Sequence, residues 1–313
     1  MNRDDKELFK KLSQELEYFS DTKLELPILQ DEKIKSVFIK QLIDSIRRVK
    51  YALTVSQRKI TIETTNPLSQ AFDPVKGAIY LKNHDNIDNA SWLIFLSTHF
   101  GYSPQSKWLL IKDVYGNFGE KPYWDWDNVY NNLTDFDSWT SSLFERIKPL
   151  VPVRKFGNHR KYETLKYGTK RSLNNVVSSY VSLLLPYKGH TNLFNDVMER
   201  NKGCKYKSFE YLYSYFEPVM SFGRTARFDF LTMLGKVGLI EIEPPKTYMR
   251  NSTGPAKGAR LLFGLNSASA VVLEKKLFTL SQYLSINPFG MQVLEDALCN
   301  WQKSPKSYIY FKG

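Results

Sequence analysis

The feature that most constrains the fold is the spacing of apolar residues in segment 32–55. Seven of them recur there at helical intervals, with Lys and Arg on the other face: Ile34, Val37, Phe38, Leu42, Ile46, Val49 and Leu53. An α-helix turns once every 3.6 residues, so this spacing gathers the apolar side chains on one side. The segment is therefore predicted to be an amphipathic helix that buries one face.

Comparable patterns predict helices along most of the chain. Segment 59–78 is the main exception, because its turn residues and two prolines predict a loop with room for one short strand. Strand signals are few elsewhere, and no internal repeat or low-complexity segment is found. The fold is therefore predicted to be mainly α, with further helices at 5–19, 85–101, 124–147, 159–185, 205–216, 222–238, 255–264, 267–285 and 288–302.

The length allows one large domain or two closely packed ones. The chain has 313 residues and a mass of 36.5 kDa, enough to bury a sizeable core. Pro149 and Pro152 mark the predicted division. It separates an N-terminal helical region, 1–150, from a DNA-binding and catalytic helical region, 151–313. The alternative is one continuous domain.

The charge predicts an anionic partner. The formal net charge is +12 and the isoelectric point is near 9.4, so nucleic acid is the simplest candidate. An acidic membrane surface is disfavoured, because the cations are not gathered in one tail or one amphipathic helix. We call segment 154–171 the basic segment: it holds seven Lys or Arg and a single acid, Glu163.

Cysteines and histidines argue against a metal site. Cys204 and Cys299 lie far apart with no CxxC spacing, and the four histidines (His84, His99, His159 and His190) form no HxxxH or HExxH pair. No metal and no cofactor are therefore expected. The first residues are charged where a signal peptide would be apolar, and no apolar run approaches membrane-spanning length. The expected location is the cytoplasm.

Two glycine turns precede basic helices. Segment 221–239 carries Gly223, Arg224 and Arg227, and segment 252–264 carries Gly254, Lys257 and Arg260. Exposed N–H groups at a helix start, behind a small residue, form a site for a phosphate. Helix-hairpin-helix DNA-binding proteins use the same physics, although helix-starting glycines are also common in other proteins.

Two carboxylates are candidates for chemistry. Asp229 lies between Phe228 and Phe230, so we expect it to be partly desolvated, which suits a general base or a stabiliser of a cationic transition state. A structural ion pair with Arg224, with Arg227 or with a neighbouring helix is the alternative. Glu163 is the rival carboxylate, in a cationic and wetter setting, where a solvated helix face with ion pairs is the common case.

Other polar and aromatic residues have weaker claims. His99 is expected to be a core histidine at a helix end rather than a catalytic one. Most tryptophans are expected in the core, although the stretch YWDWD at 123–127 could wall a base-binding pocket. Asp113 and Asp125 are the next carboxylates to consider.

Five motifs together resemble one protein family. They are NASWLIFLSTHFG, IKDVYG, KFGNHRKYE, FGRTARFDFLTMLGKVGL and TGPAKGARLLFG, in this order between residues 60 and 265. The chain resembles the alpha-glutamyl/putrescinyl thymine pyrophosphorylase family, clade-3 type, whose members are helical and DNA-glycosylase-like. The family name reflects a link to hypermodified thymine in phage DNA.

The resemblance implies a function. The chain is similar to an antiphage DNA glycosylase of this family, which removes glucosylated hydroxymethylcytosine and leaves an abasic site. This implies a double-stranded DNA partner, phage DNA with modified bases, and a base flipped out of the duplex for excision. Two alternatives stay open: a base-modifying transferase or pyrophosphorylase acting on activated thymine, and a nucleic-acid-binding module without enzymatic activity.

The resemblance also selects site residues. No lysine of the Gly223 segment stands where a bifunctional lyase would carry its Schiff-base amine, so a monofunctional enzyme is expected. Asp229, or failing that Glu163, is inferred from the chemistry to be catalytic. The residues expected to bind DNA are Asn158, His159, Arg160, Lys161, Gly223, Arg224, Gly254, Lys257 and Arg260.

Overall fold

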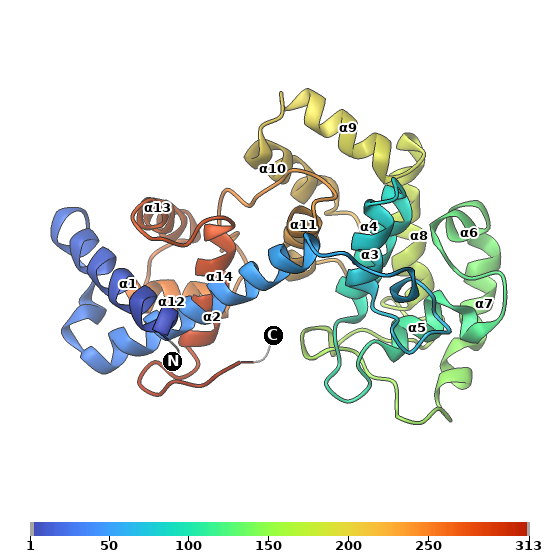
Figure 1. Ribbon diagram of the computed structural model, residues 1–313, viewed down its shortest axis with the longest axis horizontal. Coiled ribbons are helices and arrows are strands. Elements are labelled where there is room, and N and C mark those ends of the chain that lie inside the picture. Colours follow the sequence, from blue (N-terminus) through green and yellow to red (C-terminus); the bar gives the residue numbers. More distant parts are fainter. Residues whose placement is uncertain (1–2, 312–313) are drawn as a thin grey trace. The chain divides into compact units, whose positions relative to one another are not determined.

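The structure is a computed structural model that describes residues 3–311. These residues form fourteen α-helices and five short 3-10 helices, with no β-strand among them (Figure 1). The prediction of a mainly α fold is confirmed. Within the same range, no helix combines the length and apolarity needed to cross a membrane.

The chain divides into two compact units, which we describe separately. The first consists of the residues up to Thr54 together with those from Glu243 onward, and the second is Val55–Ile242. Residue 150, where prolines suggested a boundary, lies inside the second unit. The functional division of the chain at that point stays a prediction.

The first unit joins both ends of the sequence around one core. Phe38 on α2 lies with its ring centroid 4.9 Å from that of Trp301 on α14. A Cβ on Gly258 of α12 would lie 2.4 Å from the Leu298 carbonyl oxygen, so only glycine allows α12 and α14 to pack this closely. The helices of this unit are α1 (Arg3–Thr22), η1 (Pro27–Gln30), α2 (Glu32–Ser56), α12 (Gly254–Phe263), α13 (Ala270–Ser281) and α14 (Gly290–Trp301).

The second unit is built around a central buried helix, α4 (Ile87–Phe100), which packs against α3, α9 and α11 (Figure 1). Every residue of α4 from Asn89 to Phe100 is buried, as an apolar helix with neighbours on all sides should be. The other helices are η2 (Ile62–Thr64), α3 (Pro74–Lys82), α5 (Leu109–Tyr115), η3 (Asn117–Gly119), α6 (Trp126–Asn131), α7 (Leu133–Ile147), η4 (Asn158–Arg160), α8 (Leu173–Leu184), η5 (Leu185–Tyr187), α9 (His190–Arg200), α10 (Lys205–Tyr215) and α11 (Arg224–Val237).

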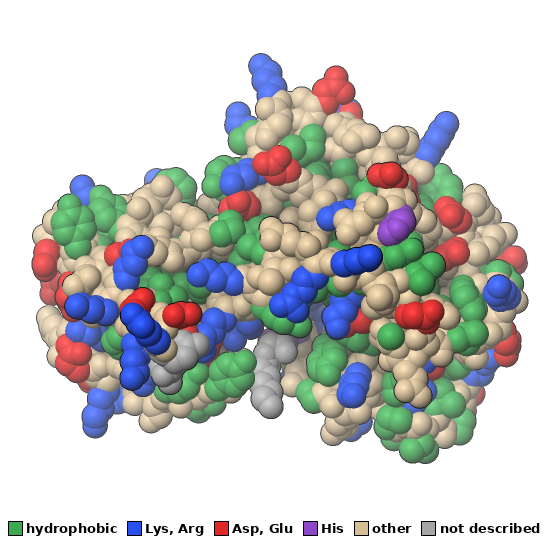
Figure 2. Space-filling model, in the orientation of Figure 1, with side chains coloured by type: hydrophobic (Ala, Val, Ile, Leu, Met, Phe, Trp, Pro, Cys, Tyr) green, Lys and Arg blue, Asp and Glu red, His purple; other side chains and the backbone are tan. Residues whose placement is uncertain are grey.

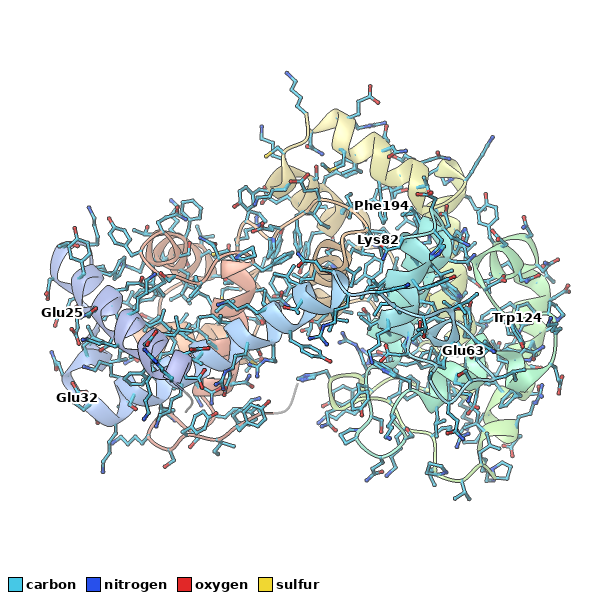
Figure 3. The ribbon with its side chains drawn as sticks, in the orientation of Figure 1. Glu25, Glu32, Glu63, Lys82, Trp124 and Phe194 are labelled. Carbon is cyan, nitrogen blue, oxygen red and sulfur yellow. The ribbon has the colours of Figure 1, made fainter. Side chains whose placement is uncertain are left out.

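Aromatic rings fill the core of this unit. The rings of Phe95 and Tyr180 stack with centroids 3.7 Å apart. Trp92 donates its indole N–H to the Trp124 carbonyl at 2.9 Å, and Trp124, labelled in Figure 3, packs against Phe136. Trp124 and Trp126 are both buried. The YWDWD tryptophans are therefore core residues, not an exposed wall for a base.

The basic segment is not the helix predicted over 159–185. Its residues form η4 and irregular turns, and α8 begins only at Leu173. Gly168 has a left-handed φ of +74°, and Thr164 Oγ1 accepts a hydrogen bond from the Lys166 N–H at 3.1 Å. Glycine and such local side-chain bonds compete with helix formation, and this stretch has no apolar stripe to favour a helix.

The remaining helix predictions agree with the structure to within a few residues, with three kinds of difference. Segment 124–147 is two helices, α6 and α7, and segment 59–78 includes the start of α3 instead of a strand. Three helices were not predicted: α3, α5 and α9. Asp73 caps α3 by accepting hydrogen bonds from the N–H groups of Val75 and Lys76. This cap stabilises a helix that is otherwise short.

Candidate functional site

The basic segment lies on the surface of the second unit and is anchored through Gly157. The Gly157 N–H donates to the Phe100 carbonyl at 2.8 Å. A Cβ at Gly157 would come within 2.8 Å of the Tyr102 carbonyl oxygen, so the close approach requires glycine. Asn158, His159 and Lys161 follow and are exposed, as a DNA-contacting role requires.

Arg160 differs from these neighbours because it points inward. Its side chain is only 10% exposed, and its guanidinium donates to the Thr98 carbonyl at 2.6 Å and to the Asp229 carboxylate at 2.8 Å. The sequence predicted a phosphate contact for this arginine. In the structure it joins the end of α4 to Asp229 on α11, so it positions a carboxylate.

Asp229 lies on the outer side of α11. Phe228 and Phe230 are buried, but they lie on other faces of the helix, and the Asp229 side chain is 45% exposed. Of the alternatives, Asp229 forms the ion pair with a neighbouring helix, through Arg160 of η4, and not the ones with Arg224 or Arg227. Arg227 instead donates to the Tyr213 carbonyl at 2.9 Å and to Glu217 at 3.4 Å.

Glu163 is the more buried of the two carboxylates. Its side chain is 8% exposed, and one oxygen lies 3.9 Å from Arg171. Burial raises the pKa of Glu163, while a contact from the Ser221 hydroxyl and the charges of Arg171 and Arg160 partly oppose this. The predicted environments are therefore reversed: Glu163 is the desolvated carboxylate and Asp229 the accessible one.

Ser221 is a neighbour of Glu163 that sequence reasoning missed. Its hydroxyl lies beside the Glu163 carboxylate and lowers its pKa, although Ser221 Oγ and Glu163 Oε2 are both buried without a well-formed hydrogen bond. Ser221 also has a left-handed φ of 59°. Neither its residue type nor its spacing indicates this position, because the segments 163 and 221 meet only in the folded chain.

His99 is close to this group but does not titrate near neutral pH. Burial lowers the pKa of His99 to about 3, and the charge of Arg160 adds to the effect. Its ring packs parallel to that of Phe95. His99 is therefore a neutral core histidine, as the sequence analysis expected.

The start of α11 lies next to these residues. Gly223 precedes the helix, is exposed, and has no heavy atom within 4 Å of where a Cβ would be. The first turn of α11 follows, with Arg224 partly exposed, Thr225 exposed and Ala226 buried. Arg224, one residue on, lies over the Phe228 ring with its guanidinium carbon 5.9 Å from the centroid.

The other glycine turn belongs to the first unit. Gly254 begins α12, and Lys257 on this helix is exposed. Arg260 donates twice to the Ala268 carbonyl, at 3.2 and 3.1 Å, so it braces the loop after α12. The two glycine turns thus belong to separate units.

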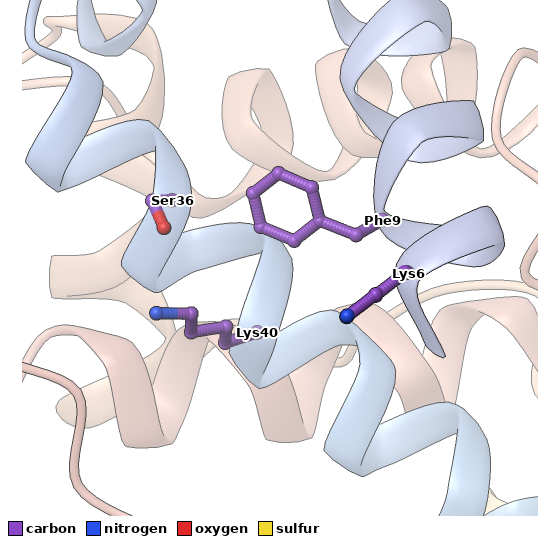
Figure 4. Close-up of a pocket in the computed structure, with 4 residues that line it drawn as sticks. All are labelled: Lys6, Phe9, Ser36 and Lys40. Carbon is purple, nitrogen blue, oxygen red and sulfur yellow. The ribbon is translucent and has the colours of Figure 1, made fainter. Parts of the chain in front are cut away.

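Cations are also found away from both turns. Lys and Arg are spread among acids on the face drawn in Figure 2. In the first unit, a groove of about 250 Å³ is lined by Lys6 and Phe9 of α1 and Ser36 and Lys40 of α2 (Figure 4). This lining can attract an anion, and it contains no carboxylate.

Metal ligands are not gathered anywhere in residues 3–311: no three or more His, Cys, Asp and Glu are grouped so that they could hold an ion. Arg160 pairs with the accessible carboxylate of Asp229, and its positive charge also lowers the pKa of the buried Glu163 carboxylate.

Comparison with known proteins identifies the family. No curated protein and no solved structure matches the chain. A family model, alpha-glutamyl/putrescinyl thymine pyrophosphorylase clade 3, matches residues 33–313. This match covers the second unit and most of the first, and it includes the basic segment, Asp229 and both glycine turns. The chain belongs to the alpha-glutamyl/putrescinyl thymine pyrophosphorylase family, clade 3.

Proposed function

We propose that the protein is a monofunctional DNA glycosylase that excises a bulky modified base from invading phage DNA. The observation that carries the proposal is the carboxylate Asp229, which is accessible yet fixed by a buried arginine, Arg160, at 2.8 Å. It lies beside an exposed cationic loop and the open start of α11. Family membership supports an enzyme whose target is a modified base.

DNA would be bound through its phosphates. Asn158, His159 and Lys161 are exposed in the basic segment, and Gly223 before α11 is exposed with open space beside it. Contacts of this kind fix the position of a duplex and weaken steeply as salt rises. The exposed ring of Tyr162, with the Lys161 ammonium 5.1 Å from its centroid, offers a surface on which a base can stack.

The chemistry proposed for Asp229 follows from the reaction. The bond between the deoxyribose C1′ and the base nitrogen breaks, its electron pair leaves with the base, and the base takes up a proton. Positive charge develops on the sugar, and a nearby carboxylate stabilises it. Water then adds to C1′ and gives up a proton, to Asp229 in this proposal. The products are the free base and an abasic sugar.

Arg160 and Glu163 would act through Asp229. Arg160 holds the carboxylate in place, and Glu163 is too buried to meet a sugar in this conformation. The family name favours a second candidate function, displacement of pyrophosphate from an activated thymine base. The same site would serve it, because positioning an extrahelical base is common to both reactions.

The test is release of free base from phage genomic DNAs that differ in base modification, scored as abasic sites. Asp229→Asn should fold, bind the DNA like wild type and lose at least ~10²-fold in rate, the scale of a lost general base. Near-normal turnover by this variant would move catalysis to Glu163. Release or consumption of pyrophosphate without abasic sites would favour the second function, and binding without either reaction a non-enzymatic module.

A further inference from the structure

The groove between α1 and α2 is a cationic surface that the proposed function does not use. It has a volume of about 250 Å³ and lies within the first unit. Lys6 and Phe9 of α1 and Ser36 and Lys40 of α2 line it, and the Phe9 ring points from α1 toward Ser36 (Figure 4). Sites for drug-sized ligands usually measure about 300–1,000 Å³, so this groove suits a smaller ligand or a single unit of a polymer.

Ion pairs join α1 to α2 on both sides of this groove. Arg47 pairs with Asp5 on one side, and Lys35 pairs with Glu17 at 3.2 Å on the other. Along each helix the lining residues come between these two pairs, so the helices run antiparallel with the groove in the middle. Because the ion pairs already hold the walls in place, a ligand would not have to order them on binding.

Acids of the protein do not neutralise the charge of the groove. Within residues 3–311, neither the Lys6 nor the Lys40 ammonium forms an ion pair, and the Ser36 hydroxyl forms no hydrogen bond. The Lys40 ammonium lies 5.7 Å from the centroid of the Tyr308 ring, which carries no charge. Acids of the same helices are paired with other cations: Asp5 with Arg47, Glu7 with Arg3, and Glu17 with Lys35. Two positive charges and a hydroxyl donor are therefore available to an anion.

The lining favours a phosphate that is attached to a planar ring. Lysine binds phosphate as a point charge, and a serine hydroxyl can donate to a phosphate oxygen. An aromatic ring such as Phe9 gives a sugar or a base a surface to pack against. One ring is too little apolar surface for a bilayer or for a stable protein interface. A nucleotide is the ligand that matches all of these groups.

We propose that the groove binds one nucleotide unit, with its phosphate on Lys6, Lys40 and Ser36 and its sugar or base against Phe9. The unit belongs either to a DNA strand or to a free nucleotide, since both present the same chemistry. The proposed site lies in the first unit and does not depend on Asp229 or on base excision.

The first measurement is the salt dependence of binding to unmodified duplex DNA by the full chain. If the nucleotide unit belongs to DNA, Lys6→Gln and Lys40→Gln should each lower the slope of log affinity against log salt by about one. Ser36→Ala should weaken binding about threefold and leave the slope unchanged, because it removes a hydrogen bond but no charge. Lys10→Gln is the matched control: it removes the same charge from an exposed position of α1 that does not line the groove, so its slope should equal that of wild type.

The second measurement is calorimetric titration with a deoxynucleoside monophosphate. If the ligand is a free nucleotide, wild type and Lys10→Gln should bind it, Lys6→Gln and Lys40→Gln should bind it about tenfold more weakly, and DNA binding should not change. If both groove variants match Lys10→Gln toward DNA and toward the mononucleotide, the proposal is wrong. A loss confined to anionic phospholipid vesicles would also overturn it and would assign the groove to a membrane. Neither measurement uses base release, so both remain decisive if the protein is not a glycosylase.

Discussion

Asp88 offers a test of how the second unit is held together. It lies in the first turn of α4 and accepts hydrogen bonds from the start of α9: from Thr191 Oγ1 at 2.7 Å, from the Thr191 N–H at 3.4 Å, and from the His190 N–H. His190 Nδ1 is 3.1 Å away, and His190 Nε2 is 2.6 Å from the Tyr180 hydroxyl. A Cβ at Gly189 would collide with this carboxylate, so glycine is required there.

The contribution of Asp88 to the free energy of unfolding follows from its pKa. Burial alone would raise it, but the hydrogen bonds from His190 and Thr191 outweigh burial and lower it from 3.8 to about 2. At about 1.36 kcal/mol per unit of pKa, this corresponds to about 2.5 kcal/mol of stability. The sign is that of a depressed acid: the stabilisation is complete above the unfolded value of 3.8 and is lost as pH falls through about 2.

His190 adds a second acid-sensitive contribution. Burial lowers the pKa of His190, although Asp88 opposes the effect, so the folded protein favours the neutral imidazole. Protonation of His190 in the unfolded chain therefore begins to reduce stability as pH falls below 6.5. Asp88→Asn should be about 2 kcal/mol less stable than wild type at pH 7, with a melting temperature roughly 4–8 °C lower for a unit of this size.

The assay is unfolding in urea, followed by tryptophan fluorescence, between pH 2 and 7. The gap between wild type and Asp88→Asn should shrink as pH falls below 3.8. Asp85→Asn is the control, because Asp85 is exposed and its left-handed φ of 58° also suits Asn. If the free energies of unfolding of wild type and Asp88→Asn differ by less than ~0.5 kcal/mol at pH 7, or if their difference stays constant on acidification, Asp88 does not join α4 to α9 in this way.

Three further predictions concern DNA binding, helix packing and metal dependence. Lys257→Ala should lower the slope of log affinity against log salt for duplex DNA by about one without loss of stability, and an unchanged slope would mean that α12 does not contact DNA. Arg260→Ala should instead lower the free energy of unfolding by about 1 kcal/mol, because it leaves the Ala268 carbonyl without its hydrogen-bond donor. Gly258→Ala should lower the free energy of unfolding, measured by thermal denaturation, by about 1–3 kcal/mol, because the added Cβ would overlap the Leu298 carbonyl. An unchanged stability would mean that α12 and α14 can move apart at little cost. Base release should survive EDTA, and inactivation that Mg²⁺ or Mn²⁺ restores would instead indicate phosphoryl-transfer or nuclease chemistry.

Local patterns were sufficient for most helices of this protein. The apolar spacing of segment 32–55 identified α2, whose bounds are Glu32–Ser56, because a helix with one buried face repeats its apolar residues every three or four positions. Helices α3 and α5 escaped detection, since each is short and carries too few turns to show a period. The basic segment was mistaken for a helix because charge count says nothing about backbone conformation.

The sequence by itself determined the mainly α class, the cationic character and the residues worth testing, because these depend on composition and on neighbours along the chain. Tertiary structure decided which carboxylate is buried. The neighbours in sequence suggested a desolvated Asp229 and a solvated Glu163. In the structure the Asp229 side chain is 45% exposed and the Glu163 side chain is 8% exposed. Phe228 and Phe230 lie on other faces of the helix than Asp229, and Ser221, one neighbour of the Glu163 carboxylate, comes from a turn far along the chain. Burial depends on contacts that only folding brings together.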